Sequence, residues 1–317
     1  MARNFVQNVL VPCASPTDEA RDRSLVLNLL AALRPDQWIK NLVVYAALIF
    51  GQKLFDPTAA LITTAAFAVF CGLSGTAYLI NDVMDYRQDR RHPLKAKRPI
   101  AAGTVSRTFA LVAAALTGTL ALVIAFWLKT NFGLVASGFI GLLILYSTLL
   151  KHILILDVLT IASGFVMRAV AGAVAIDVPI SRWLLLCTVL LALFLVLTKR
   201  RHELVLLSDD AVTHRQILGD YTPYLLDQMI AITSAATLVS YAIYTLNPET
   251  VQKFNTNLLT LTFLFPLYGI FRYLYLIHRK SDDGNPSAVL LNDRPLGLCV
   301  ALWAAVSVLI IYQPFVH

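Results

Sequence analysis

One stretch after a long apolar segment decides how this chain is interpreted: Asn81-Asp82-Val83-Met84-Asp85-Tyr86-Arg87-Gln88-Asp89. Carried on as a helix, Asn81, Asp85 and Asp89 are four residues apart and Asp82 is three before Asp85, so their oxygens share one face. Clustered acids repel one another unless a cation lies among them, and Mg²⁺ favours a few carboxylates completed by substrate phosphate and water. The stretch therefore predicts a magnesium site. A solvated helix end with incidental acids is the alternative, and the basic segment that follows argues against it.

Composition indicates a membrane protein. The chain has 317 residues, of which 58% are hydrophobic and 14% are charged, and its mean hydropathy is +0.69. A soluble domain normally has about a quarter charged residues, and apolar runs of about 18–22 residues are long enough to cross a bilayer core. We expect an all-α integral membrane protein with nine transmembrane helices, at about 37–55, 58–80, 108–128, 132–150, 153–175, 182–199, 227–246, 257–277 and 296–313.

The basic residues predict the orientation. With nine crossings, the N-terminal arm and the loops after the second, fourth, sixth and eighth helices lie on one side and hold most of the 26 Lys and Arg residues. The loops on the other side hold only Lys53, Lys129, Arg182 and Lys253. By the positive-inside rule we expect a multi-pass protein of the inner (plasma) membrane, with its N-terminus in the cytoplasm and its C-terminus outside.

The remaining composition adds weaker expectations. Residues 1–32 are polar and lack the pattern of a cleavable signal peptide, so we expect a cytoplasmic arm before a catalytic domain at 33–317. The net charge of +7 suits anionic membrane lipids and phosphorylated substrates, and no nucleic acid partner is expected. The four cysteines show no metal-site or disulfide spacing. Small residues on the helices permit a homo-oligomer, which the sequence leaves open.

The segment after Asp89 is basic and is bent by Pro93 and Pro99. A basic, bent segment next to carboxylates suits a diphosphate, because the acids hold Mg²⁺ while the cations neutralise the remaining phosphate oxygens. Lys95 and Arg98 are the candidates for this role. A loop whose charge serves only the membrane topology is the alternative.

Two further segments carry candidates near the fourth and fifth expected helices. Tyr146 and Lys151 lie where these helices join, and Asp157 and Arg168 share one face of the fifth. An Asp and an Arg buried in an apolar helix are costly unless they face a polar cavity or each other. They are therefore either part of a binding site or a structural pair.

Two basic segments at helix ends complete the candidates. The sixth expected helix ends in Lys199-Arg200-Arg201-His202-Glu203, and three consecutive cations cannot share one face, so we expect one or two to point inward, with Lys199 and Arg201 as candidates. Lys40 and Asn41 begin the first helix. They either face a substrate phosphate or belong to a membrane anchor in which Arg34 and Lys40 reach the interface.

These motifs resemble the UbiA superfamily of intramembrane prenyltransferases over nearly all of the chain beyond residue 30. The superfamily has nine spans around a central cavity open to the cytoplasm, with an Asn-Asp-x-x-Asp-x-x-x-Asp motif after the second span. Four further segments resemble a branch that transfers 5-phosphoribose from phosphoribosyl diphosphate (PRPP) to a decaprenyl-like polyprenyl phosphate: 34–41, 89–99, 146–151 and 199–203. Which glycan pathway, such as a cell wall arabinan, uses the product is left open.

The chain departs from ordinary superfamily members after the fourth span. Those members carry a second aspartate motif there, and this chain has Tyr146, Lys151 and a single Asp157. A lysine in place of an acid suits direct capture of a phosphate monoester, so the number of Mg²⁺ ions stays open.

The resemblance implies Mg²⁺-dependent transfer with release of diphosphate. The expected metal ligands are Asn81, Asp82, Asp85 and Asp89, and the expected catalytic residues are Asp85, Asp89, Lys151 and Arg168. The expected substrate-binding residues are Lys40, Asn41, Lys95, Arg98, Tyr146, Asp157, Lys199 and Arg201. A phosphate monoester is already anionic, so as a nucleophile it needs orientation more than deprotonation.

Other function classes compete with this one. An ordinary UbiA prenyltransferase, which moves a prenyl group from a prenyl diphosphate to an aromatic or other acceptor, shares the fold and the metal site. A transporter would be expected to show internal repeats and broken midplane helices, whereas the charges here gather at one membrane face. A noncatalytic scaffold would leave the clustered aspartates without a purpose.

Overall fold

The computed structural model describes residues 25–91, 95–207, 219–279, 289–290 and 292–313. The described residues form helices joined by short connections, and eight helical segments are long and apolar enough to cross a membrane. These segments are α4 (Pro57–Met84), α7 (Arg107–Leu128), α8 (Thr130–Thr148), α9 (Leu156–Ala175), α10 (Arg182–Leu207), α12 (Pro223–Leu246), η6 with α14 (Leu258–Phe263 and Leu264–Arg279) and α16 (Arg294–Tyr312). The expected all-α fold with repeated membrane-length helices is confirmed.

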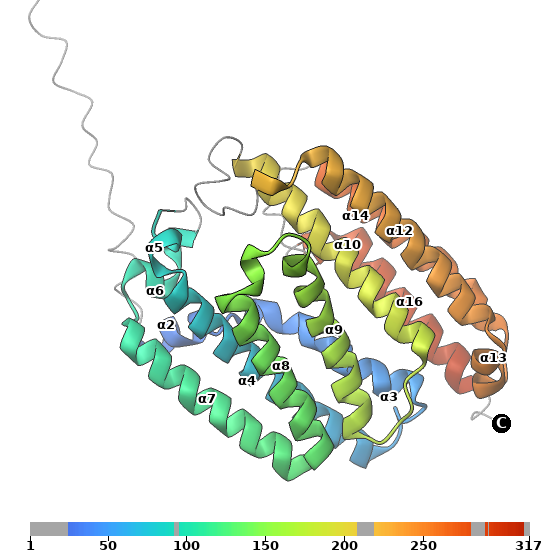
Figure 1. Ribbon diagram of the computed structural model, residues 1–317. Helices are drawn as coiled ribbons and strands as arrows, with labels where there is room; N and C mark the ends of the chain where they lie inside the picture. Colours follow the sequence, from blue (N-terminus) through green and yellow to red (C-terminus); the bar gives the residue numbers. More distant parts are fainter. Residues whose placement is uncertain (1–24, 92–94, 208–218, 280–288, 291, 314–317) are drawn as a thin grey trace, which may run out of the picture.

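Neighbours in sequence are mostly neighbours in space. Helix α4 packs against α7, α7 against α8, α8 against α9, α9 against α10 and α10 against α12, while α14 packs against α16 (Figure 1). Large apolar side chains lie exposed on the outer faces, among them Leu116 at 67%, Trp127 at 83% and Leu309 at 70% exposure. Apolar surface of this extent fits a surrounding of lipid and marks a multi-pass membrane protein.

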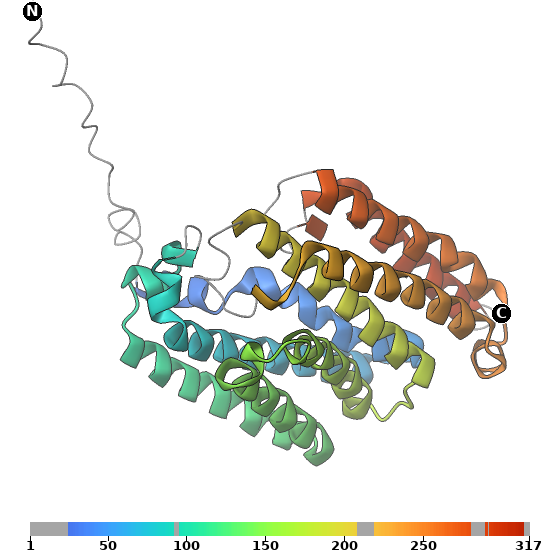
Figure 2. The ribbon, with the colours of Figure 1, turned by 45° about the horizontal axis from the view of Figure 1, so that its top comes forward.

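The first expected helix, 37–55, differs from the expectation. The structure has a 3₁₀ helix, η1 (Pro35–Tyr45), followed by the short α3 (Ala46–Phe50). The 3₁₀ form rises about 2.0 Å per residue against about 1.5 Å in an α-helix, so these segments together extend about 30 Å. They lie between α4 and α9, inside the ring of longer helices (Figure 2).

The short helices gather at the two ends of the molecule. Helices α2 (Leu25–Ala32), α5 (Tyr86–Asp89) and α6 (Pro99–Ala102) lie at one end, and α13 (Pro248–Phe254) lies with the end of α16 at the other (Figure 1). Of the expected N-terminal arm, residues 1–24 lie outside the described residues. The rest of it, α2, packs against α4 and α6.

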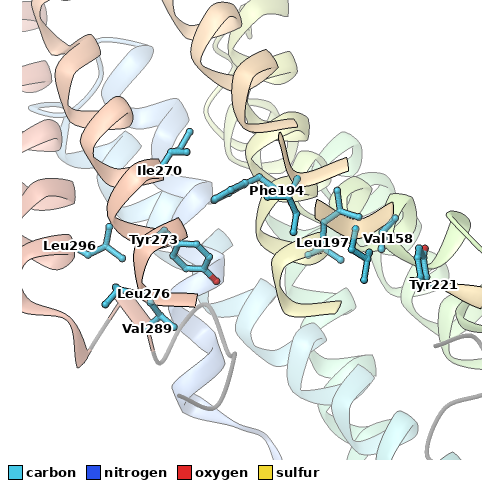
Figure 3. Close-up of a cluster of buried hydrophobic side chains, with 12 residues drawn as sticks. Val158, Phe194, Leu197, Tyr221, Ile270, Tyr273, Leu276, Val289 and Leu296 are labelled. Carbon is cyan, nitrogen blue, oxygen red and sulfur yellow. The ribbon is translucent and has the colours of Figure 1, made fainter. Parts of the chain in front are cut away.

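Buried apolar clusters join the helices on either side of the interior. Phe194 of α10 packs edge-on against Tyr273 of α14, with 5.5 Å between ring centroids, in a cluster that extends to α9 and α16 (Figure 3). A second cluster, around Phe70 and Phe139, joins α4 to α8. Protein interiors are close-packed. These clusters therefore fix the positions of α4, α8, α9 and α10, which also carry polar residues.

Gly172 lets η1 lie directly on the backbone of α9. A Cβ atom built there would stand 2.1 Å from the carbonyl oxygen of Val44. We predict that Gly172→Ala destabilises the protein by about 1–3 kcal/mol, the usual cost of overpacking, and lowers its unfolding midpoint in detergent, followed by intrinsic fluorescence. Gly141→Ala in α8 is the matched control, because a Cβ there meets nothing within 4 Å. Equal midpoints for the two variants would contradict the close packing.

Candidate active site

A cavity of about 440 Å³ lies among η1, α4, α8, α9 and α10, close to the end that carries α5 and α6. Its wall combines apolar side chains, such as Ile161 and Leu195, with charged ones. Of the predicted site residues, it brings together Lys40, Asn81, Asp85, Asp89, Lys95, Arg98, Tyr146, Lys151, Arg168 and Lys199.

The aspartate motif follows the end of α4. This helix ends at Met84, Asp85 stands in a turn, and α5 begins at the next residue. Helical hydrogen bonding continues across the turn, since the Asp85 amide donates to the carbonyl of Asn81 and the Asp89 amide to that of Asp85, each at 2.8 Å. Asn81, Asp85 and Asp89 therefore share one wall of the cavity, as their four-residue spacing predicts.

Asp82 does not line the cavity, and its side chain is 2% exposed. It accepts a hydrogen bond from Arg34 at 2.5 Å and another from Arg98 at 3.2 Å. The same Arg98 Nη1 donates to Asp89 at 2.6 Å, so the Asp82 and Asp89 carboxylates are close neighbours. Asp82 is a shared counter-ion for two arginines, and its expected role as a magnesium ligand stays a prediction.

The two cavity acids each face a cation from another segment. Lys151 lies 2.5 Å from Asp85, which also accepts a hydrogen bond from the Asn81 amide at 3.0 Å. Arg98 lies 2.6 Å from Asp89. Burial raises the pKa of the Asp89 carboxyl, and the neighbouring Arg98 opposes this shift. Each of these two acids therefore has a cation beside it.

The donor set on this wall fits a magnesium ion. In residues 25–313, apart from the stretches that the structure does not describe, no three His, Cys, Asp or Glu side chains converge as a ready metal cluster. Asn81, Asp85 and Asp89 instead offer hard oxygen atoms, and Mg²⁺ takes few protein ligands when phosphate and water complete its shell. Lys151 and Arg98 already pair with two of these side chains, Asp85 and Asp89.

Asp157 pairs with a residue that sequence reasoning did not select. It is fully buried and accepts hydrogen bonds from Arg200 at 2.8 Å and from the Tyr221 hydroxyl at 2.9 Å. Burial raises the pKa of Tyr221 to about 12, so its hydroxyl stays protonated as a donor. The proposed pair of Asp157 with Arg168 is absent from these contacts. Asp157 lies outside the cavity wall and holds Arg200, which lines it.

The remaining candidates divide between the wall and the layer behind it. Arg201 pairs with Asp227 and does not line the cavity, contrary to the expectation. Asn41 lies behind the wall and accepts a hydrogen bond from Arg168 at 2.7 Å. The wall also includes residues with no predicted role: Arg34, Ser74, Tyr78, Gln88, His152, Arg200 and Glu203. His92 and Pro93 of the basic segment lie outside the described residues.

The UbiA prenyltransferase family matches residues 41–293. The chain belongs to this family. A decaprenyl-phosphate phosphoribosyltransferase of Mycolicibacterium smegmatis is 34% identical over 291 residues, which cover 89% of this chain and 91% of the relative. Proteins of the same name from Mycobacterium tuberculosis and Corynebacterium glutamicum are 32% and 30% identical, over 89% and 92% of this chain and 93% and 88% of theirs.

Solved structures of UbiA homologues share the fold. One from Archaeoglobus fulgidus, bound to GPP and Mg²⁺, superposes with a TM-score of 0.67 at 19% identity and covers 90% of this chain and 99% of its own. One from Aeropyrum pernix gives a TM-score of 0.62, also at 19% identity, over 85% and 98%. The Archaeoglobus homologue thus binds both GPP and Mg²⁺.

The buried position of Asp82 makes it important for stability. We predict that Asp82→Asn lowers the unfolding midpoint in detergent by several degrees, because removing one partner of a buried ion pair costs about 3–5 kcal/mol. Asp227→Asn is the matched control. Its partner Arg201 forms a pair in which the Asp side chain is 40% exposed, and such surface pairs contribute about 0–1 kcal/mol. A midpoint for Asp82→Asn as high as that of the control would contradict the assignment.

Proposed function

We propose that the protein transfers 5-phosphoribose from PRPP to a decaprenyl-like polyprenyl phosphate and releases diphosphate, with Mg²⁺ as cofactor. The observation that carries this proposal is the charge of the cavity, whose wall has eight Lys and Arg side chains against three carboxylates. PRPP and a polyprenyl phosphate together bring four phosphoryl groups, whereas a prenyl diphosphate with an uncharged acceptor brings two. The names of the relatives support the same activity.

The residues at the charged end suit the donor. Asn81, Asp85 and Asp89 would hold Mg²⁺ on the diphosphate, and the ion would offset charge on the leaving group. Lys95, Arg98 and Lys151 neutralise phosphate oxygens that the metal leaves exposed. The last two exchange their carboxylate partners for phosphate when the donor enters.

The reaction itself requires little proton transfer. An oxygen of the lipid phosphate attacks the anomeric carbon, the bond from that carbon to the diphosphate oxygen breaks, and diphosphate leaves with the electron pair. Since the nucleophile is already anionic, the protein contributes orientation and charge neutralisation. In-line attack inverts the configuration at that carbon. The lipid tail extends along apolar wall residues such as Ile161 and Leu195.

We further propose nine crossings of the inner (plasma) membrane, with the N-terminus cytoplasmic, the cavity open to the cytoplasm and residues 33–317 as the catalytic domain. Arg34, before η1, contacts Asp82 near the end of α4, whereas the carbonyl of Ile49 in α3 accepts from the Tyr312 hydroxyl at the end of α16. From the rise per residue, η1 and α3 together are about 30 Å long. Their length and their contacts at both ends of the molecule support a membrane crossing by η1 and α3. The basic loops near the cavity support the orientation.

Ordinary prenyl transfer is the second candidate, supported by the family and by the GPP-bound structural neighbour. Radiolabelled PRPP and radiolabelled prenyl diphosphate, each supplied with purified protein, Mg²⁺ and the matching acceptor, separate the two activities. We expect label from PRPP to enter the lipid fraction, with a product mass equal to polyprenyl phosphate plus phosphoribose. Label that enters product only from the prenyl diphosphate would replace our proposal with the second candidate.

The metal assignment predicts the effect of removing one carboxylate. Asp85→Asn and Asp89→Asn should each lower phosphoribosyl transfer at least about 100-fold, the upper range for disturbing a metal site, while the unfolding midpoint in detergent stays within a few degrees of wild type. Asp227→Asn, remote from the cavity, is the control and should retain activity. EDTA should stop the wild-type enzyme and added Mg²⁺ should restore it. Folded variants with near-normal turnover would remove these carboxylates from the metal site.

A further inference from the structure

The cavity holds a second group of cations, whose partners differ from those at the aspartate motif. Arg168 of α9, Lys40 of η1 and Lys199 of α10 form this inner cluster on the cavity wall. Arg168 contacts Ser74, and Lys151 contacts Asp85. Ser74 and Asp85 are about 16 Å apart along the axis of α4. A single diphosphate cannot reach both places.

Arg168 is held by neutral groups. Its side chain is 6% exposed, and its guanidinium donates to Asn41 Oδ1 at 2.7 Å, to the Gly164 carbonyl at 2.9 Å and to Ser74 Oγ at 3.4 Å. Among the residues that the structure describes, no carboxylate lies within ion-pair distance of it. Since a guanidinium has five N–H donors, donors remain on both terminal nitrogens for a ligand.

The guanidinium is also fixed in place. The rings of Phe139 and Phe165 lie 4.7 and 5.2 Å from it. Asn41 is itself fully buried, and its amide donates to Cys71 Sγ at 3.3 Å, which leaves its carbonyl oxygen directed to Arg168. Asn41 is therefore a positioning residue for Arg168.

The other two cations increase the local positive charge. Lys40 lies within electrostatic reach of both Arg168 and Lys199, and it forms no ion pair within the described part of the chain. Lys199 has Glu203 at a long 3.9 Å. Three cations of like charge in an apolar surrounding are costly unless an anion joins them. On the outer wall, Lys151 and Arg98 face carboxylates at the shorter distances of 2.5 and 2.6 Å.

We propose that Lys40, Arg168 and Lys199 form a metal-independent site for a phosphate monoester, separate from the metal-dependent diphosphate site at the aspartate motif. The inference rests on the proposed function, which supplies two monoesters of this chemistry: the terminal phosphate of the polyprenyl lipid and the 5-phosphate of PRPP. The one carboxylate near the cluster, Glu203, already pairs with Lys199 at 3.9 Å and with Arg200 at 2.7 Å, so the cations of the cluster would bind phosphate oxygens directly.

Binding in EDTA tests this site apart from turnover. Titration calorimetry would measure the binding of farnesyl phosphate and, separately, of ribose 5-phosphate to purified protein. We expect wild type to bind at least one probe without metal, and Arg168→Gln and Lys40→Gln each to weaken that binding about tenfold or more, the loss typical of a charged hydrogen bond. Arg201→Gln is the matched control, because Arg201 lies outside the cavity, and it should bind as wild type does.

The outcomes identify the source of the phosphate. If the variants lose binding of farnesyl phosphate alone, the cluster is assigned to the lipid phosphate. If they lose binding of ribose 5-phosphate alone, it is assigned to the 5-phosphate of the donor. Either result supports the site. Unchanged binding in Lys40→Gln, which breaks no structural contact, overturns it even if Arg168→Gln does not fold. Absence of metal-free binding in wild type also overturns it.

Asn41→Asp adds a readout specific to charge. The introduced carboxylate still accepts a hydrogen bond from Arg168, but its negative charge cancels the charge of the guanidinium. Phosphate binding should therefore fall at least as far as in Lys40→Gln, while the unfolding midpoint is retained. Binding equal to wild type in this folded variant would count against the site. If wild type transfers label from PRPP but the variants bind both probes normally, only this inference fails. If wild type transfers no label from PRPP, the proposed function fails.

Discussion

A charge within a membrane-embedded cavity requires a partner, and this requirement organises the interior of the protein. Asp157 is stabilised by Arg200 and Tyr221, and Asp82 by Arg34 and Arg98. Each pair joins segments that are far apart in sequence, so the pairs that compensate buried acids also place arginines on the cavity wall. The acids behind the wall thus determine which cations a substrate meets.

The first segment of the chain depends on a close backbone contact. Gly172 allows Val44 of η1 to approach the backbone of α9, and Asn41 and Arg168 lie one turn away on the same two elements. The contact between backbones therefore brings the Asn41 carbonyl within 2.7 Å of the guanidinium. A bulkier residue at 172 would separate these elements and weaken the support of Arg168 along with the packing.

The sequence predicted the helical membrane fold, and most of the predicted site residues line the cavity. Apolar runs set the helices, and a four-residue spacing put Asn81, Asp85 and Asp89 together. Asp82 belongs to the same acidic group, since the step of seven residues from Asp82 to Asp89 makes nearly two helical turns, but spacing could not predict that Arg34 and Arg98 would pair with it. Local spacing could not choose between Arg200 and Arg201, because that choice depends on Asp157 of another helix. Nor could it predict that 35–45 would be a 3₁₀ helix, whose form depends on its contacts with α4 and α9.

The two ends of the cavity meet the cost of buried charge in opposite ways. At the aspartate motif, cations and carboxylates neutralise each other before a substrate enters, so a bare metal ion has to compete with Lys151 and Arg98 for the same oxygens. In our proposal, a metal that arrived on a diphosphate would avoid this competition, since Lys151 and Arg98 would gain phosphate oxygens as partners. Around Arg168, neutral hydrogen-bond acceptors hold the cation without cancelling its charge. The two ends of the cavity therefore differ in their partners: carboxylates face Lys151 and Arg98 at one end, and neutral acceptors leave the charge of Arg168 uncancelled at the other.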